Sequence, residues 1–412
     1  MRFPKLILDR DFPIRPIIKR ITSNKGLVER VAKIKDKTLS EAKEYTEKKS
    51  LKYLLNMVGG ENPGLKDCLR KPIKLLYLNG FFKNIKVDEK SVEKIKDAQN
   101  EGSVLFLPPH YSMLDFVSET WIFDKYNIKH PYIAAGSNIW PSKFYLLDLF
   151  IRSFRGFPID RKRTKKKDIL YLTTLKEFTK EILGQGHNLL LYLDGGRRKN
   201  GEPNIPKTGE LKSVIEYQKE NPEKKIFIAP VPVSYDRIPE DNEMVNERLT
   251  GLSKYNTSDM FRIPFLPSYN RRCGELSIKF NEPYLLSDYL NQEENRKGAR
   301  ATQGKRLADR VIEDIENSKE VMDTQLIAAE IAECPEKRVL KEWVIEKIQK
   351  IKGIKDIRVA RKMLDDVERI YSTGGFIRKY TEKGKDWWEI KKSNMLSFYK
   401  NQVVNKYRNG KN

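Results

Sequence analysis

The chain has 412 residues, of which 39% are hydrophobic, and its net charge is +23 at pH 7. This length predicts two or three domains with a sizeable core. The composition excludes an integral membrane protein, because no window reaches the roughly 18 consecutive apolar residues of a spanning helix. Three scattered cysteines, Cys68, Cys273 and Cys334, indicate neither a disulfide framework nor a zinc site. They favour a reducing, cytoplasmic compartment.

The positive charge favours a polyanionic partner, which is either nucleic acid or the anionic leaflet of a membrane. A lysine-rich proteome produces the same excess without any partner. Charge alone therefore leaves these alternatives open.

Residues 1–97 are predicted to form a basic, helical region. The first 20 residues start apolar but lack the hydrophobic core and the cleavage site of a signal peptide. Val28–Glu47 contains helix formers throughout and no glycine or proline, which predicts a helix. Cys68–Phe82 is apolar with interspersed cations, a pattern that fits either docking on a membrane surface or packing in the core.

From 98 to 304, short apolar runs alternate with longer helical patterns. The strand candidates are Ser103–Leu107, Tyr132–Ala135, Asn188–Tyr192, Ile226–Val233 and Gly274–Phe280. The helix candidates are Ser112–Asp124, Pro141–Arg152, Asp168–Leu183 and Glu210–Lys219. This alternation predicts an α/β domain with a mostly parallel or mixed central sheet and flanking helices.

Two stretches interrupt this alternation. Asp236–Asn270 is polar and irregular and is predicted to leave the core, and Asp288–Gly304 is predicted to be a linker or an exposed helix. Residues 305–412 are again predicted to be helical, because apolar residues recur at helical spacing from Leu340 to Ile351.

A candidate general base follows the first predicted strand. His110 comes after Pro108-Pro109, which end the strand, and Asp115 stands five positions on, where a helix is predicted to begin near Ser112. A histidine oriented by a carboxylate can remove a proton from an alcohol. Five positions on one helix correspond to about 500°, so the side chains can meet only if His110 lies on the loop before the helix. The alternative is that Asp115 only caps the helix.

Two further clusters combine cations with tight turns. Arg161 follows a short apolar segment and can be held rigidly for anion binding, whereas the lysines after it fit a solvated face. Asp194-Gly195-Gly196-Arg197 follows a predicted strand, where the glycines fit a phosphate cradle or a simple change of chain direction. Lys207 adds another cation at a predicted helix start.

These segments resemble, in order, the motifs of the glycerol-phosphate acyltransferase branch of the glycerolipid acyltransferase family. His110 to Asp115 resembles the first motif, Gly156–Arg161 the second, and Asp194–Arg197 followed by 206–209 the third. Pro230-Val-Pro232-Val, which on its own fits a core strand or a sheet edge, resembles the fourth.

The resemblance covers 98–285 strongly and 320–405 more loosely. Tyr132–Pro141 is similar to this branch rather than to the smaller lysophosphatidic-acid acyltransferases. Leu396-Ser-Phe-Tyr-Lys-Asn401 is similar to a stretch beyond the catalytic domain of larger members.

The resemblance implies an O-acyltransferase that moves an acyl group from acyl-CoA or acyl-carrier protein to the 1-hydroxyl of sn-glycerol 3-phosphate. It implies that His110 is the base and that Asp115 orients it. It also implies a phosphate pocket and an acyl-side wall. The pocket residues are Arg161, Asp194, Gly195, Gly196, Arg197 and Lys207, and the wall residues are Pro230 and Pro232. No cofactor and no metal are expected, because arginine and lysine meet the charge of the phosphate.

The sequence departs from the family pattern in several places. Asp194 replaces a glutamate, Arg198 replaces a serine, and Gly156 lies about one residue nearer its arginine than the pattern has it. Asn405 stands where related enzymes often carry a histidine. These departures bear on acceptor preference more than on the reaction, and they leave an inactive, scaffold-like relative as an alternative.

The resemblance also gives the charge an interpretation. We expect peripheral docking on the anionic, cytoplasmic face of a membrane through the basic N-terminal region. The enzymatic alternatives are a dihydroxyacetone-phosphate acyltransferase and a lysophospholipid acyltransferase. The non-enzymatic alternative, a basic nucleic-acid-binding protein, explains none of the four motifs, so no nucleic-acid partner is expected.

Overall fold

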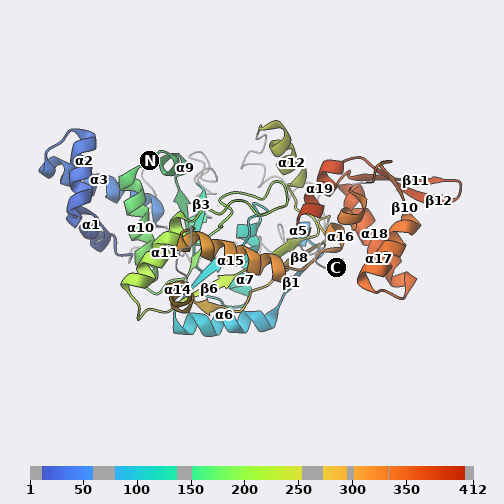
Figure 1. Cartoon of the computed structure of the whole chain (residues 1–412), viewed down its shortest axis with the longest axis horizontal. Coiled ribbons are helices and arrows are strands. Elements are labelled where there is room, and N and C mark those ends of the chain that lie inside the picture. The colour runs from blue at the N-terminus through green and yellow to red at the C-terminus, as the bar shows by residue number, and fades with distance from the viewer. Residues whose placement is uncertain are drawn as a thin grey trace.

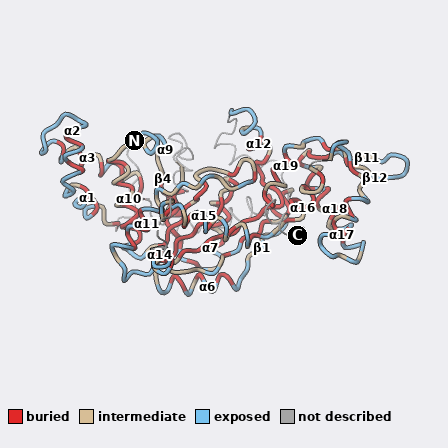
Figure 2. The backbone as a smooth tube through the Cα atoms, viewed as in Figure 1, coloured by how far each residue is buried: buried red, intermediate tan, exposed pale blue. Residues whose placement is uncertain are grey.

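The computed structural model describes residues 12–58, 79–136, 151–252, 272–294, 301–332 and 334–403. Three units follow one another along its long axis, with N-terminal helices at one end, an α/β unit in the middle and a smaller C-terminal unit at the other end (Figure 1). Buried backbone runs through all three units and is densest in the middle one (Figure 2).

The elements of the described residues follow in chain order. The helices are α1 (Ile14–Ser23), α2 (Lys25–Lys35), α3 (Leu39–Met57), α5 (Asn79–Phe81), α6 (Glu89–Glu101), α7 (Asp115–Lys125), α9 (Arg161–Lys165), α10 (Ile169–Gly184), α11 (Gly209–Glu220), α12 (Asp241–Thr250), α14 (Leu286–Glu294), α15 (Gln303–Ser318), α16 (Asp323–Ile331), α17 (Lys341–Lys352), α18 (Ile357–Thr373) and α19 (Ser393–Asn401). The strands are β1 (Asn84–Val87), β2 (Ser103–Leu107), β3 (Tyr132–Gly136), β4 (Gly156–Ile159), β5 (Leu189–Leu190), β6 (Ile226–Pro230), β7 (Val233–Tyr235), β8 (Glu275–Ile278), β9 (Tyr284–Leu285), β10 (Arg338–Leu340), β11 (Ile377–Glu382) and β12 (Lys385–Ile390).

The central sheet has six strands in the order β4-β3-β5-β2-β6-β9. The first five are parallel, and β9 pairs antiparallel with β6. β2 is buried along its whole length, as a parallel strand covered on both faces should be. Val104 and Phe106 belong to the core cluster that includes α6 and α7, whereas Leu105 and Leu107 belong to the cluster that includes α10 and α11. The predicted α/β fold is confirmed.

The parallel arrangement brings the predicted motifs to one edge of the sheet. The loops after β2, β4, β5 and β6 all leave from the carboxyl ends of their strands. These loops contain the four sequence motifs, so residues more than 100 positions apart are brought to a common edge. Open α/β sheets bind their ligands at this edge.

A second sheet, in the order β1-β8-β7, extends the middle unit. The strand predicted over Ile226–Val233 is in fact two, because the chain changes sheets at Val231-Pro232 and a proline has no N–H to continue a ladder. β1 pairs with β8, and α6 contacts β2. The α/β unit therefore begins ahead of the boundary expected at residue 98.

The N-terminal helices pack on the α/β unit. Ile17 and Ile21 of α1 are buried, and α1 and α3 both contact α10. The single helix predicted over Val28–Glu47 is wrong, because Asp36 adopts a left-handed conformation with φ 50° between α2 and α3. Thr38 then caps α3 in a capping box with Glu41, a signal that the sequence already contained.

The stretch after β7 does not leave the core at its start, which corrects the expectation for Asp236–Asn270. Residues 236–241 are all buried, and a regular helix, α12, follows. Asp236 accepts a hydrogen bond from the Glu275 N–H at 2.8 Å and one from the Thr324 hydroxyl at 3.2 Å. These bonds join the second sheet to α16. Residues 253–271 lie outside the described residues.

The C-terminal unit contains a sheet in addition to the expected helices. β10, β12 and β11 form an antiparallel sheet in that order, α17 and α18 pack beside it, and α16 contacts these two helices. The β11–β12 hairpin turns at Lys383 and Gly384, which both have positive φ. Most side chains of β11 are exposed and polar, so the strand lacks the apolar alternation that would have predicted it.

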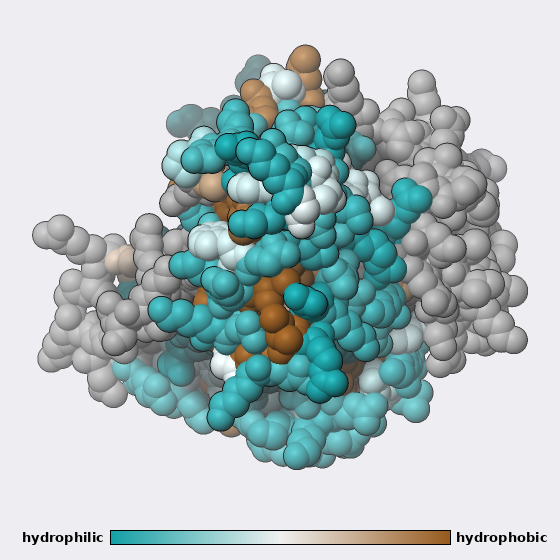
Figure 3. All heavy atoms as spheres, turned by 90° about the vertical axis from the view of Figure 1, so that its right-hand side faces the viewer, coloured by the Kyte–Doolittle hydropathy of each residue, from teal (hydrophilic) through white to brown (hydrophobic). Residues whose placement is uncertain are grey.

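The outer face of this unit exposes apolar side chains among charged ones (Figure 3). Trp343 and Ile351 on α17 are 37% and 39% exposed, and Ile357 and Val359 on α18 are 46% and 54% exposed. α17 ends at Gly353, which has φ 65°, and α18 begins four residues later. The apolar patch therefore lies on a helix–turn–helix.

The remaining expectations are met to differing extents. α10 and α11 match the predicted helices closely, whereas the strand predicted over Asn188–Tyr192 is reduced to β5. Cys68 and most of Pro141–Arg152 lie outside the described residues, as do 295–300 in the predicted linker. Among the described helices, none has both the length and the apolar character needed to cross a bilayer.

Candidate active site

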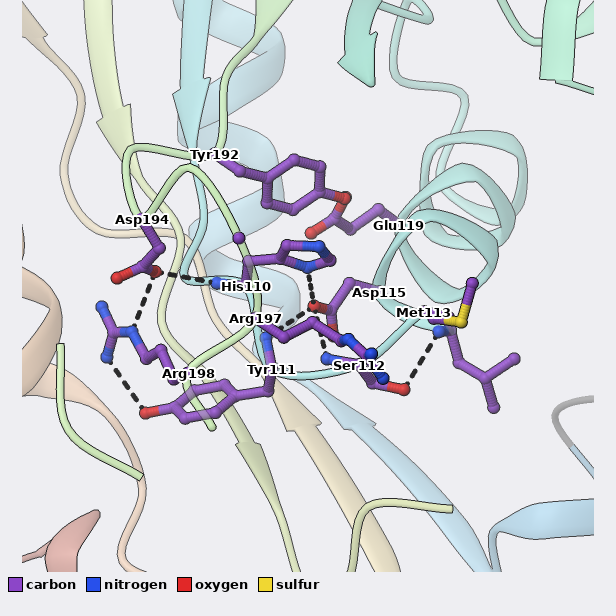
Figure 4. A network of polar contacts seen from close by, with 12 residues as sticks. His110, Tyr111, Ser112, Met113, Asp115, Glu119, Tyr192, Asp194, Arg197 and Arg198 are labelled. Atoms are coloured by element: carbon purple, nitrogen blue, oxygen red, sulfur yellow. Dashed lines mark hydrogen bonds and ion pairs between the residues drawn. The ribbon is translucent and has the colours of Figure 1, made fainter. Parts of the chain in front are cut away.

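His110 and Asp115 meet where β2 ends. β2 ends at Leu107, two prolines carry the chain out of the sheet, and α7 begins at Asp115. The His110 Nδ1 atom lies 2.9 Å from Oδ2 of Asp115 (Figure 4). Because a carboxylate can only accept, Nδ1 carries the proton, and the lone pair of Nε2 is left to take a proton from an alcohol. The His110 side chain keeps 15% exposure, so this nitrogen is not sealed in the core.

The Asp115 carboxylate is fully buried and receives three donors besides the histidine. Oδ2 accepts the N–H groups of Tyr111 at 2.8 Å and Ser112 at 2.9 Å. Oδ1 accepts the Tyr235 hydroxyl at 2.5 Å. The helix begins at Asp115, three residues after Ser112, near which it was predicted to begin. The same carboxylate thus closes the turn before α7 and orients the histidine, which makes the capping and orienting interpretations compatible.

The loop after β5 holds the backbone of His110 on both sides. Oδ2 of Asp194 accepts the His110 N–H at 2.9 Å. The Arg198 N–H donates to the His110 carbonyl at 2.8 Å. Asp194 also accepts the Asn204 N–H at 3.1 Å, and it is 4% exposed. These contacts give Asp194 a positioning role toward the histidine rather than a free surface toward a ligand.

Asp194 and Arg198, the two departures of the third motif, are partners of each other. The Arg198 Nε donates to Asp194 at 2.8 Å, and Nη1 contacts Glu316 at 2.6 Å and the Tyr111 hydroxyl at 3.1 Å. Burial alone would lower the pKa of Arg198, but Tyr111, Asp194 and Glu316 together raise it. Arg198 therefore stays charged in the core, and the pair locks the loop onto α15.

Tyr192 and Glu119, which sequence reasoning missed, flank the histidine ring. The Tyr192 ring lies 4.7 Å from the His110 ring, centroid to centroid, at 34°. Its hydroxyl donates to Glu119 at 2.5 Å (Figure 4). Burial and the nearby Asp115 raise the pKa of Glu119 well above its usual value. This shift favours the protonated form of Glu119, which adds no second negative charge beside Asp115.

Arg197 is engaged by carboxylates of the segment that includes α12. Its guanidinium contacts Glu240 at 3.5 Å and Glu247 at 3.3 Å. Glu240 also accepts hydrogen bonds from the Ser112 hydroxyl at 2.9 Å and from the Met113 N–H at 2.6 Å. Arg197 thus lies beside the turn that contains the base, but an incoming anion must compete with two glutamates for it.

Arg161 and Lys207 are the cations of the predicted pocket without carboxylate partners in the described part of the chain. Burial lowers the pKa of Arg161, which begins α9 directly after β4. Lys207 is exposed and lies against Gly195, whose φ is +63° and where a Cβ would come 2.4 Å from the lysine Cγ. A Cβ on Gly196 would meet open space.

β2 and β4 are three strand spacings apart, so the loops that hold His110 and Arg161 leave the sheet about 14 Å from each other.

Pro230 and Pro232 lie at the end of β6, next to the strand that leads to the histidine. Between them, the Val231 N–H donates to the Leu107 carbonyl at 3.2 Å. Both prolines are buried, and Val231 borders a small apolar cavity that Pro108 and Glu119 also line. Of this segment it is Val231, and neither of the two prolines, that borders this cavity, so the acyl-side wall expected of Pro230 and Pro232 stays a prediction.

The assembled site offers a base, a buried orienting acid and cations at one sheet edge. This combination can deprotonate an alcohol that carries an anionic group. Nowhere in the described ranges do three or more His, Cys, Asp or Glu side chains form a group suited to a metal ion. The residues that sequence reasoning missed, Tyr235, Glu119 and Tyr192, gave no local signal, because their partners lie far away in the chain.

Two protein-family models match the chain. The family described as "Acyltransferase" matches residues 89–234, and the one described as "Glycerol-3-phosphate acyltransferase C-terminal region" matches residues 257–407. The first match contains all four motifs, and the second contains the C-terminal unit.

Curated relatives are similar over part of their length. The mitochondrial glycerol-3-phosphate acyltransferase 1 of Mus musculus is 31% identical over 264 residues, which cover 62% of this chain and 31% of the relative. The glycerol-3-phosphate acyltransferase of Histophilus somni is 28% identical over 207 residues, which cover 50% of this chain and 25% of the relative. The chain thus spans about a third or less of these relatives.

Among solved structures, the 1-acyl-sn-glycerophosphate (LPA) acyltransferase from Thermotoga maritima aligns with a TM-score of 0.34 and 13% identity. The alignment covers 61% of this chain and 82% of that one.

Proposed function

Since the chain belongs to the glycerol-3-phosphate acyltransferase family, we propose that it transfers a fatty acyl group from acyl-CoA or acyl-carrier protein to the 1-hydroxyl of sn-glycerol 3-phosphate. The product is lysophosphatidic acid. The contact between His110 and Asp115 at the carboxyl edge of the sheet carries this proposal. The matched relatives have the same activity in their names, although the chain spans only part of them.

In this mechanism His110 removes the proton of the glycerol hydroxyl through Nε2. The alkoxide attacks the thioester carbonyl while Asp115 stabilises the imidazolium through Nδ1. The C–S bond then breaks, and the departing thiolate takes the proton back from Nε2 of His110, which leaves as products the ester, the free thiol and a neutral histidine. A positioned base contributes typically 10²–10⁴-fold to the rate. No covalent acyl-enzyme is needed, because the hydroxyl attacks the donor directly.

The phosphate of the acceptor is assigned to Arg161, Arg197 and Lys207, with Gly195 and Gly196 shaping the loop. The lack of carboxylate partners at Arg161 and Lys207 in the described residues supports this assignment. Holding the phosphate turns the attack into an effectively intramolecular step, which is a large entropic gain. Arg197 can bind the phosphate only when the phosphate displaces Glu240 and Glu247 from its guanidinium. We therefore expect Arg197 to contribute to the selection of the acceptor.

The test is acyl transfer to sn-glycerol 3-phosphate by wild type, His110→Ala and His187→Ala. His187 precedes β5, at the opposite edge of the sheet, and serves as the matched control. We expect His110→Ala to lose at least about 100-fold in turnover and His187→Ala to keep it. Equal turnover by wild type and His110→Ala overturns the proposal.

The same assay separates the alternative acceptors. Dihydroxyacetone phosphate has a hydroxyl and a phosphate at the same spacing as in sn-glycerol 3-phosphate. In a lysophospholipid with a headgroup alcohol, the phosphate is a diester. Higher kcat/KM with either acceptor than with sn-glycerol 3-phosphate would reassign the substrate.

Nucleic-acid binding stays a less favoured alternative. The helix–turn–helix of the C-terminal unit is a shape that DNA-binding proteins also use, and it is the reason to consider this alternative. However, residues 323–390 contain 15 basic and 13 acidic residues, so the unit is nearly neutral. A basic face is the electrostatic requirement for such binding. A salt-dependent mobility shift with duplex DNA would be needed to revive this alternative.

We further propose that the N-terminal helices dock peripherally on the anionic, inner face of a membrane. Residues 12–58 contain 12 basic and 5 acidic residues. Ile34 and Leu39, at the turn between α2 and α3, are 61% and 59% exposed. Exposed apolar side chains among lysines suit an anionic lipid interface.

Flotation with phosphatidylglycerol and phosphatidylcholine vesicles tests the docking. We expect recovery with the anionic vesicles only, and a clear loss for Leu39→Asp. Val359→Asp, on the apolar patch at the other end of the molecule, is the matched control (Figure 3). Recovery that is independent of lipid charge, or that depends on Val359 instead, contradicts the N-terminal surface.

A further inference from the structure

A cavity of about 700 Å³ opens between the N-terminal helices and the α/β unit. One wall comes from α2 and α3, and the other comes from the end of α9 and the start of α10. Its volume falls within the range of small-molecule sites, roughly 300–1,000 Å³. Half of its lining precedes residue 89, so this half lies outside the two matched family segments.

The lining of this cavity is strongly cationic. It includes six basic residues, which are Arg30, Lys35, Lys49, Arg163, Lys166 and Lys167. Its single acidic residue, Asp168, is already paired with Arg163 at 2.9 Å. Elsewhere in the described residues, many lysines form ion pairs with a glutamate or an aspartate. Of the six basic residues around the cavity, only Arg163 forms an ion pair within the described residues. So many unpaired cations around one concavity repel one another until an anion binds.

The cavity also contains aromatic and apolar surface. Tyr45 lies between Lys35 and Lys49, with each ammonium 6.0 Å from the ring centroid. Ile34, which is 61% exposed, adds apolar area at the rim. A ligand with several phosphates and a planar ring fits this combination better than inorganic phosphate, which would leave the aromatic and apolar walls unused. A concave wall is also a poor match for a flat lipid surface.

The position of the cavity links it to the proposed reaction. α9 starts at Arg161, which belongs to the acceptor pocket, and ends beside Lys166 and Lys167 in the cavity. Both sites thus lie at the carboxyl edge of the sheet, with the cavity beyond β4 and His110 three strands away at β2. A donor whose charged end and reacting thioester are separated by a long, flexible arm can occupy both places at once.

We propose that this cavity binds the phosphorylated adenosine end of an acyl-CoA donor. The inference rests on the proposed acyl transfer and deepens it, because it selects acyl-CoA over a carrier protein. The cations contact the 3′-phosphate and the diphosphate, Tyr45 contacts the adenine, and the pantetheine arm runs along the sheet edge toward His110.

The first experiment measures binding alone. Full-length protein is titrated with adenosine 3′,5′-bisphosphate by calorimetry, comparing wild type, Arg30→Ala/Lys49→Ala and Lys33→Ala/Lys52→Ala. The control pair lies on the same two helices, is exposed and does not line the cavity. Loss of charge-assisted hydrogen bonds should weaken binding by about tenfold or more in the first variant, and by less than about twofold in the control.

A second pair of variants guards against misfolding. Lys166→Ala/Lys167→Ala removes cations from the opposite wall, and Lys162→Ala/Lys165→Ala removes neighbours that do not line the cavity. Thermal melts identify any variant that fails to fold. Equal binding of the bisphosphate by cavity and control variants overturns the proposal. Displacement of the bisphosphate by inorganic phosphate at equal concentration also overturns it.

Kinetics then connect the cavity to the reaction. For the cavity variants we expect the KM for acyl-CoA to rise by about tenfold, with kcat and the KM for sn-glycerol 3-phosphate retained. Acyl-pantetheine, which lacks the nucleotide, should be used equally by all variants. Failure of wild type to use any donor refutes the proposed function but leaves the binding result standing. If the cavity variants no longer float with phosphatidylglycerol vesicles but bind the bisphosphate as wild type does, the cavity is a lipid site, and the proposal of a nucleotide site is refuted.

Discussion

Tyr235 lies outside the four motifs but contacts the carboxylate of the candidate base pair. It donates to the Asp115 oxygen that His110 does not use, at 2.5 Å, and both groups are buried. Tyr235→Phe removes a hydrogen bond to a buried carboxylate, worth about 1.5 kcal/mol or more. We expect kcat to fall about tenfold while the KM for sn-glycerol 3-phosphate changes less than about twofold. Steady-state kinetics measure this, with Tyr217→Phe on α11 as a buried control. An unchanged kcat would contradict the orienting role.

Tyr192 holds the imidazole by its ring rather than by its hydroxyl. The ring stacks on His110, whereas the hydroxyl points to Glu119. Tyr192→Phe keeps the ring and should retain kcat within about threefold, because the lost hydrogen bond, worth about 1 kcal/mol, is to Glu119 and not to His110. Tyr192→Leu removes the ring and should lower kcat by up to about tenfold, since aromatic pairs contribute about 0.5–1.5 kcal/mol beyond burial. Similar kcat values for both variants would show that stacking does not position the base.

The contact between His110 and Asp115 was predictable, whereas its surroundings were not. His110 and Asp115 lie five positions apart, so a strand end followed by a helix start brings them together. Tyr235 lies 120 positions from Asp115, and Tyr192 lies 73 positions from Glu119. No local pattern encodes such contacts, because they depend on which strands become neighbours in the sheet.

At the scale of elements, the loop after β5 depends on the buried pair of Asp194 and Arg198. Arg198→Ser, which restores the residue usual in the family, leaves Asp194 and Glu316 without their guanidinium. Removing one partner of a buried pair costs about 3–5 kcal/mol. We expect the free energy of unfolding in urea to fall by that amount. Lys199→Ser removes a partly exposed partner of Glu247 and should cost less than about 1 kcal/mol. Equal losses would show that the pair is not structural.

Asp236 gives the join between the second sheet and α16 a pH dependence. Burial raises the pKa of Asp236 to about 6, so the folded state holds this proton more tightly than the unfolded state does. The contribution is fully present below about pH 4 and is lost as the pH rises through about 6, amounting to about 3 kcal/mol. Asp236→Asn does not titrate, so wild type should lose stability relative to it across that window. Urea unfolding at pH 4, 5, 6 and 7 measures the difference, and a difference that does not change with pH contradicts the argument.

Element prediction succeeded where the period was regular. β2 and α10 match their predicted spans closely, because their apolar patterns are uninterrupted. β11 was missed because it is a surface strand with charged side chains. β7 was merged with β6 because prolines within an apolar run do not reveal a change of sheet.

At the scale of the whole molecule, the C-terminal unit braces the candidate active site. The resemblance already singled out Leu396–Asn401, and the structure gives that stretch contacts. The Tyr399 hydroxyl donates to Asp241 at 2.8 Å and accepts the Ile238 N–H at 3.0 Å. Asn401 donates to the Asn200 carbonyl at 2.9 Å, three residues after Arg197. α19 therefore supports both the loop after β5 and the segment that leads into α12, which explains why a distant stretch accompanies the catalytic motifs.

Gly201 is the point where α19 comes closest to that loop. Its φ is +88°, and a Cβ would lie 2.2 Å from the Phe398 carbonyl oxygen. Gly201→Ala must therefore strain the backbone and also push α19 away from the loop. We expect the free energy of unfolding to fall by about 3 kcal/mol or more, and acyl transfer to fall with it because the loop positions His110.

Gly251→Ala is the matched control for this substitution. Gly251 also has a positive φ, +69°, but a Cβ there meets nothing within 4 Å. Gly251→Ala should lower the free energy of unfolding only by the backbone strain, about 1–2 kcal/mol, and should leave acyl transfer unchanged. Urea unfolding and initial rates measure both effects. Equal losses of stability at the two glycines, or full activity in Gly201→Ala, would show that the C-terminal unit does not brace the site.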